Sequence, residues 1–118
     1  MSSFAAATSA EGPSGVLLVN ATQFCGWIGQ ASRGDRLEYH RGVLALDASD
    51  CSQNFVGHRR RELNRVAHRA WWAAEQGLVH LFQRRNAPND FSYLAIARLH
   101  ADEIPQSLSS VLSKEVAS

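Results

Sequence analysis

The sequence predicts a compact α+β domain in the order helix, strand, helix, strand, strand, with the strands in a small antiparallel sheet. Three observations predict it. Two segments carry apolar residues at helical spacing, three shorter segments have the pattern of strands, and a turn-rich segment joins the last two strands. A length of 118 residues fits one domain of this kind.

The first helix is predicted to begin after Asn20, because NATQ at residues 20–23 has the form of a capping box. In that motif the Asn20 and Gln23 side chains satisfy backbone amides that the first turn leaves without partners. Gly34 is the expected end of this helix. The apolar stripe of the helix follows the spacing i, i+3, i+4 and i+7 and consists of Phe24, Trp27, Ile28 and Ala31.

Residues 36–46 predict the first strand, since their side chains alternate between two faces. Residues 47–57 are polar and turn-prone, and they predict a connection to the next helix. One face of the strand would carry Leu37, Tyr39 and Val43, and the other Glu38, His40 and Leu44.

The longest helix is predicted over residues 58–76, before Gly77, because glycine commonly follows a helix C-terminus. Trp71 continues the apolar face of this helix and is expected in the core. Trp72 points about 100° away, toward the side that carries arginines. The apolar face consists of Leu63, Val66, Ala67, Ala70, Trp71 and Ala74.

A β-hairpin is predicted from residues 78–85 and 91–99, which both read as strands. Residues 86–90 form a five-residue loop rich in turn formers between them. The expected core-facing residues of the hairpin are Val79 and Leu81 on the first strand and Leu94 and Ile96 on the second.

The two ends of the chain differ in composition from the domain that is predicted over residues 16–101. Residues 1–15 are small and polar with interspersed Pro and Gly, which is typical of a flexible leader. Residues 102–118 form a tail in which Leu108, Val111 and Leu112 recur at helical spacing, so that a short docking helix is one interpretation. No apolar run approaches the length of a membrane span, and no signal peptide is recognisable, so we expect a cytoplasmic protein without membrane contact.

The sequence AWWAAEQGLVHLFQRR at residues 70–85, followed by NAPND and FSYLAIAR, resembles the recognition helix and wing of small bacterial, phage or prophage winged-helix proteins. The resemblance covers roughly residues 20–100 and is a pattern of elements, not a catalytic signature. It implies a winged-helix-like fold and DNA binding. The family normally places two helices between the first strand and the hairpin, whereas the sequence predicts one, unless residues 49–56 contain a short turn of helix.

Positive charge is concentrated in one segment. The net charge of +1 is the sum of +5 over residues 58–85, with seven arginines and two acids, and −4 over the rest, with five bases and nine acids. In the long helix, the side chains at spacing i, i+4, i+8 and i+11 are Arg61, Arg65, Arg69 and Trp72. The predicted nucleic-acid-binding residues are Arg59, Arg60, Arg61, Arg65, Arg69, Arg84 and Arg85.

These arginines lead to the hypothesis of a small transcriptional regulator that binds double-stranded DNA as a homodimer. The helix arginines would reach phosphates or guanine edges in the major groove, and Arg84 and Arg85 would make wing contacts. Trp72 is the expected interface residue, since Trp and Arg dominate interface hot spots. The alternative is a phage-type adaptor or inhibitor that uses the same scaffold to bind an acidic protein surface without DNA contact.

The sequence carries no recognised catalytic or nucleotide-binding motif, so an enzyme is not expected and no cofactor is implied. A pairing of Cys51 with His58 lacks an orienting third group. His40 and His80 could be neighbours across two strands, but with Cys25 and Cys51 they show no metal-ligand spacing. We therefore predict no metal site, structural histidines and idle thiols.

Overall fold

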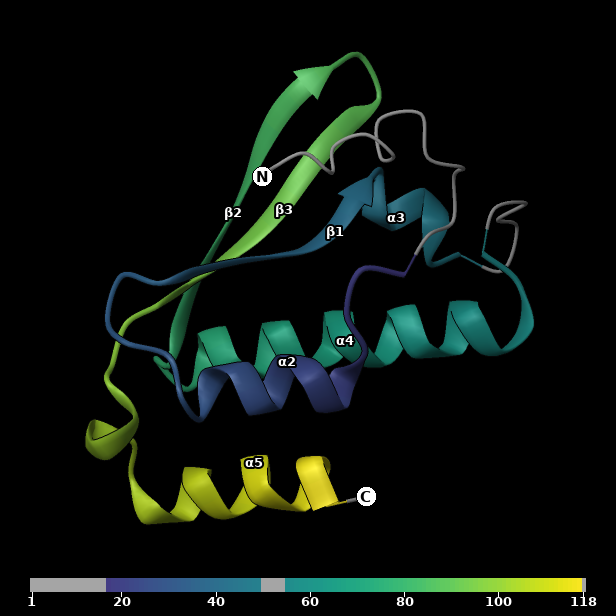
Figure 1. Ribbon diagram of the computed structural model, residues 1–118. Helices are drawn as coiled ribbons and strands as arrows, with labels where there is room; N and C mark the ends of the chain where they lie inside the picture. The colour runs from purple at the N-terminus through teal and green to yellow at the C-terminus, as the bar shows by residue number, and fades with distance from the viewer. Residues whose placement is uncertain (1–16, 50–54, 118) are drawn as a thin grey trace, which may run out of the picture.

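The computed structural model describes residues 17–49 and 55–117, so the predicted leader at residues 1–15 lies outside the described residues. The predicted α+β class is confirmed, since helices pack against a small antiparallel sheet (Figure 1). The elements are α2 (Ala21–Ile28), β1 (Arg36–Gly42), α3 (Leu44–Asp47), α4 (Gly57–Glu75), β2 (Val79–Ala87), β3 (Asp90–Ala97), a 3-10 turn (Ala101–Glu103) and α5 (Gln106–Ala117).

The sheet has the strand order β1-β3-β2, and β3 pairs antiparallel with both neighbours. Figure 1 shows α2 and α4 side by side beneath the sheet, with α5 against α2 on the side away from the strands. The β2–β3 hairpin extends away from the helices. Helix α4 leads into β2 through Gly77, whose φ of 79° is the left-handed conformation that was expected at this position.

The start of α2 confirms the predicted capping box. Asn20 Oδ1 accepts a 2.7 Å hydrogen bond from the Gln23 amide, and the Asn20 amide donates to Gln23 Oε1 at 2.9 Å. The helix ends at Ile28, earlier than predicted. Gly34 instead lies in the turn that enters β1, with φ 95°, and its amide donates to the carbonyl of Ala97 at the end of β3.

The strand that was predicted over residues 36–46 ends at Gly42. Gly42 has φ 128°, a conformation that non-glycine residues rarely adopt, and the chain leaves the sheet there to form the single turn of α3. A β-bulge between Glu38 and His40 also interrupts the predicted alternation. Because of the bulge, the consecutive residues Tyr39 and His40 are both buried.

The prediction that Trp71 lies in the core is wrong, because 64% of its surface is exposed. The side of α4 that faces the core carries Val66, Ala70 and Ala73. Trp71 lies outside this side of the helix. Trp72 is half-buried and packs at the edge of the core. The fully buried apolar residues of α4 are Leu63, Val66, Ala70 and Ala73.

The predicted core set of the hairpin is right for Val79 and Leu94, which are both buried, but it places the β3 residues on the wrong face of the sheet. Val79 pairs with Ala97 and Leu81 with Ala95, so these residues share the face toward the helices. Leu94 and Ile96 lie on the opposite face, where they pair with Phe82 and His80. On β3 the side that faces the helices carries the small residues Ala95 and Ala97, because α4 packs close to it. A prediction from hydrophobicity instead assigns the larger residues of the strand to the core. At the turn the strands extend further than predicted, so the turn consists of Pro88 and Asn89, whereas β3 ends at Ala97, before the predicted residue 99.

Helix α5 occupies the segment in which a docking helix was considered. Its residue Leu112 is buried in the same core as Phe24 and Val66. Leu108 and Ile104 pack against this core from its edge. Within the described residues, none of the helices combines the length and apolarity that a membrane crossing requires.

Candidate nucleic-acid interface

The structure divides the seven predicted nucleic-acid-binding arginines into three groups. Arg65 and Arg69 are held in ion pairs between α4 and α5. Arg59, Arg60 and Arg61 lie in the first turns of α4, and Arg84 and Arg85 lie on β2 in the hairpin. The arginines therefore do not form one continuous stripe that faces solvent.

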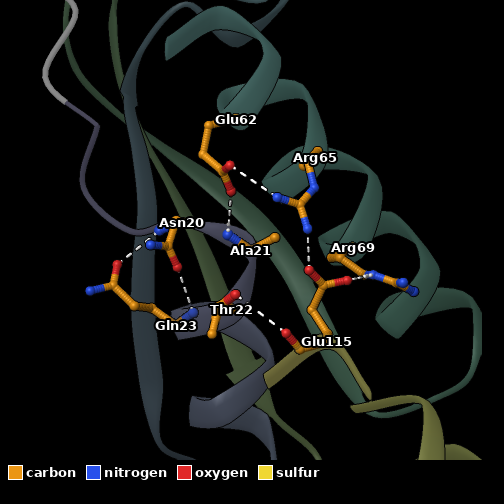
Figure 2. A network of polar contacts seen from close by, with 8 residues as sticks. All are labelled: Asn20, Ala21, Thr22, Gln23, Glu62, Arg65, Arg69 and Glu115. Carbon is orange, nitrogen blue, oxygen red and sulfur yellow. Dashed lines mark hydrogen bonds and ion pairs between the residues drawn. The ribbon is translucent and has the colours of Figure 1, made fainter. Parts of the chain in front are cut away.

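Arg65 and Arg69 converge on one carboxylate of α5, that of Glu115 (Figure 2). Arg65 Nη2 forms a close ion pair with Glu115 Oε2, and Arg69 Nε donates to Glu115 Oε1 at 3.1 Å. Arg65 Nη1 also donates to Glu62 Oε1 at 3.1 Å. Glu115 is only 7% exposed, whereas 52% of the Arg65 side chain and 32% of the Arg69 side chain remain exposed, so one buried carboxylate compensates two partly exposed arginines.

The same network joins α4 and α5 to the start of α2. Glu62 Oε2 accepts a 2.9 Å hydrogen bond from the backbone amide of Ala21, the first residue of α2. A carboxylate at this place satisfies an orphan amide and interacts favourably with the positive end of the helix dipole. Thr22 Oγ1 donates to the carbonyl of Glu115 at 3.3 Å, so three helices meet at this point.

An open cavity of about 350 Å³ lies beside the ion pairs. The Arg69 guanidinium stacks over Trp72, with Cζ 5.5 Å from the ring centroid, and so covers part of a ring that also packs against the core. The predicted interface residue therefore forms a wall of this cavity. The lining residues are Arg65, His68, Arg69, Trp72 and Glu115.

The arginines at the start of α4 have different surroundings. Arg59 Cζ lies 5.6 Å from the centroid of the Phe55 ring, and Arg59 remains exposed. Arg60 is half-buried, and Arg61 is exposed to solvent. Arg59 and Arg61 are therefore accessible to a large ligand at this end of α4.

The hairpin presents Arg84 and Arg85 on an exposed stretch of β2 that runs from Phe82 to Ala87. As consecutive strand residues they point to opposite faces of the hairpin. Within the described part of the chain, neither of them forms an ion pair.

Two side-chain contacts hold this end of the hairpin in place. Arg41 Nε and Nη2 donate to the two oxygens of Asp90 at 2.8 and 3.0 Å. This hydrogen bonding by Arg41 lowers the pKa of Asp90. Asn86 Nδ2 donates to Ser92 Oγ at 2.9 Å across the two strands. The exposed arginines are thus carried on an arm that is fixed to β1.

His40 is a buried polar residue whose partner the sequence did not reveal. It is 1% exposed, and its Nε2 lies 2.8 Å from Asp47 Oδ2 in α3. The rings of Phe55 and Tyr93 lie 5.6 and 5.7 Å from the imidazole ring. Burial lowers the pKa of His40, and the hydrogen bond with Asp47 opposes this shift.

The expected proximity of His40 and His80 is wrong, because β3 separates their strands. His40 lies opposite Tyr93, and His80 opposite Ile96. Among the described residues, no three His, Cys, Asp or Glu side chains group as metal ligands would. Cys25 is buried, and burial raises the pKa of its thiol to about 11, so it is not a nucleophile at neutral pH. Cys51, which was considered with His58, lies outside the described residues.

No protein-family model, curated protein or solved structure matches the chain.

Proposed function

We propose that the chain is a small winged-helix-like protein that binds double-stranded DNA and acts as a cytoplasmic transcriptional regulator. The order of elements supports this proposal. The short helix α3 lies between β1 and α4, so two helices, α3 and α4, lie between the first strand and the hairpin, as the winged-helix resemblance requires. Helix α4 then takes the place of the recognition helix, and the β2–β3 hairpin takes that of the wing.

The observation that carries the proposal is the exposed hairpin arm with Arg84 and Arg85. Arginines on a projecting arm are suited to phosphate or minor-groove contacts, because their charge stays accessible and their planar donors match phosphate oxygens. Arg59 and Arg61 supply further accessible charge on α4, the helix that leads into the arm. These four arginines are the DNA contacts that we propose for the structure as it stands.

Arg65 and Arg69 are not part of this first set. Their guanidinium groups are compensated by Glu115 and Glu62, and a compensated charge contributes little to phosphate binding. The proposed interface therefore uses the start of α4 and the hairpin instead of a stripe along the whole helix.

The experiment compares two charge-reversal variants in fluorescence-anisotropy titrations with a short mixed-sequence duplex at low salt. Arg84→Glu with Arg85→Glu is expected to abolish most of the binding. Arg36→Glu with Arg98→Glu removes the same charge from exposed positions at the opposite end of the sheet and is expected to retain most of it. Equal loss in both variants would show that only total charge matters, and no binding by the unmodified protein would refute the proposal.

A protein-binding function is the second candidate, and the exposure of Trp71 favours it. A tryptophan with 64% of its surface in water is an effective anchor for a protein interface. On this reading Trp71, not Trp72, would bind a second copy or dock with the free arginines on an acidic partner surface. Sedimentation of the unmodified protein and of Trp71→Ala tests the homodimer, which should dissociate in the variant. A pull-down that retains a stoichiometric protein after nuclease treatment would support the adaptor or inhibitor function.

A further inference from the structure

We propose that α5 is a displaceable latch, and that Glu115 occupies on Arg65 and Arg69 the position that a DNA phosphate takes when α5 moves away. The inference rests on the proposed DNA binding and adds a second set of contacts to it, the two arginines that Glu115 holds in ion pairs. When α5 is in place, which we call the latched state, the duplex contacts the hairpin and the start of α4. In the released state Arg65 and Arg69 extend this surface along α4.

The geometry at Glu115 carries the inference. Each of its two carboxylate oxygens is bound by a different arginine of α4, an arrangement in which a phosphate can replace the carboxylate. The cavity of about 350 Å³ opens directly beside this carboxylate. Its walls include Trp72 and His68, so an entering anion would meet further donors and an aromatic face.

The attachment of α5 is compatible with release. Among the apolar side chains of α5 that the structure describes, Leu112 is buried, Leu108 and Val111 are half-buried, and Val116 is exposed. The polar attachment includes the Glu115 carboxylate and the contact from Thr22 to the Glu115 carbonyl. A helix of 12 residues is marginal without such tertiary contacts, so removal of the carboxylate should shift α5 toward the released state.

The buried thiol of Cys25 provides a reporter of α5 release that does not depend on DNA. Cys25 lies on α2 in the core that Leu112 completes, next to Gly26, whose added Cβ would lie 3.8 Å from Val116 Cγ2 of α5. Release of α5 should expose this thiol to N-ethylmaleimide. Replacing the only other cysteine, Cys51→Ser, restricts the reaction to this site.

The first experiment compares Glu115→Gln with the control Glu103→Gln, which makes the same charge change in an exposed ion pair with Arg33. Glu115→Gln should bind the duplex about 5- to 150-fold more tightly, the usual range of a coupling between two states. The gain should disappear when Arg65→Gln and Arg69→Gln are added. Cys25 should react faster in Glu115→Gln than in the unmodified protein, and adding duplex to the unmodified protein should also accelerate the reaction.

A second variant separates release of α5 from unfolding. Gly26→Cys with Val116→Cys, in a background of Cys25→Ser and Cys51→Ser, places two thiols where a disulfide can join α2 to α5. In combination with Glu115→Gln, the oxidised protein should bind duplex as weakly as the latched protein. Reduction of the same sample should restore the tight binding.

The outcomes distinguish the two proposals. If the unmodified protein and Glu115→Gln bind duplex equally, or if oxidation of the cysteine pair changes nothing, the latch is refuted and DNA binding stands. If neither protein binds duplex at low salt but Glu115→Gln still exposes Cys25, DNA binding is refuted. The proposal that a DNA phosphate binds Arg65 and Arg69 is then refuted as well.

Discussion

Glu62 Oε2 on α4 lies 2.9 Å from the backbone nitrogen of Ala21 on α2. This hydrogen bond joins two helices through residues that are 41 positions apart in the sequence. The carboxylate caps α2 from another element, in addition to the local cap from Asn20. Its second oxygen accepts from Arg65, so the same side chain also positions an arginine of the proposed latch.

Replacement of this carboxylate should destabilise the protein measurably. Glu62→Ala leaves the buried amide of Ala21 without its acceptor and removes one of the two carboxylates that Arg65 contacts, which costs about 1 to 3 kcal/mol in the free energy of unfolding. Glu75→Ala removes an exposed glutamate from the same helix and should change it by less than about 0.5 kcal/mol. Urea denaturation followed by circular dichroism measures both. Similar losses in the two variants would show that the Glu62 contact is not structural.

The buried pair of His40 and Asp47 predicts a dependence of stability on pH. Burial lowers the pKa of His40 below its ordinary value of 6.5, so the unfolded chain binds a proton at a pH where the folded protein does not. The stability contributed by neutral His40 is therefore complete above pH 6.5 and is lost as the pH falls below that value. The groups that face the imidazole include Asp47, Glu38, Tyr93 and Phe55.

Urea denaturation at a series of pH values tests this dependence. As the pH falls below 6.5, the free energy of unfolding should decrease more steeply for the unmodified protein than for His40→Gln. His80→Gln, which changes an exposed histidine, should keep the steep dependence. A His40→Gln profile parallel to that of the unmodified protein would contradict the assignment.

The two adjacent tryptophans should behave differently on replacement. Trp71→Ala should change the free energy of unfolding by no more than about 0.5 kcal/mol, because the ring is mostly in water. Trp72→Ala removes packing against the core and the stacking of Arg69, and should cost about 2 kcal/mol. Acrylamide quenching should be stronger for Trp71. A larger stability loss for Trp71→Ala would mean that α4 is rotated from its position here.

The hairpin turn predicts a further contrast, between two replacements of Asn89. Asn89 has φ 60°, a conformation that Asn and Gly tolerate and β-branched residues do not. Asn89→Gly should leave stability within about 0.5 kcal/mol, whereas Asn89→Val should cost about 1 to 2 kcal/mol. Thermal unfolding compares the variants. If valine is tolerated, the turn does not require this backbone conformation.

Local signals in the sequence predicted local structure. The capping box at Asn20 and Gln23 and the glycine after α4 depend on residues within one turn, and the structure has both. The direction of a helix or sheet face depends on which element packs against it, so Trp71 and the β3 residues were assigned to the wrong side. The single turn of α3 follows from the backbone of Gly42, which the alternating pattern does not encode.

The sequence predicted only part of the candidate site, because the rest depends on contacts between residues that are distant in the sequence. The concentration of arginines in residues 58–85 is visible in the sequence, and the structure leaves Arg61, Arg84 and Arg85 accessible. The neutralisation of Arg65 and Arg69 comes from Glu115, about 50 residues away, and no local pattern links these residues. The only indication was the helical spacing in the tail, which predicts a helix but not the surface it covers.

The salt dependence of duplex binding tests the central proposal most directly. If Arg59, Arg61, Arg84 and Arg85 each neutralise one phosphate, log K should fall with log salt at a slope of about −3.6. Arg84→Gln with Arg85→Gln should reduce the steepness of that slope by about 1.8. An unchanged slope in this variant, or no binding at low salt by the unmodified protein, would contradict a DNA interface that includes the hairpin.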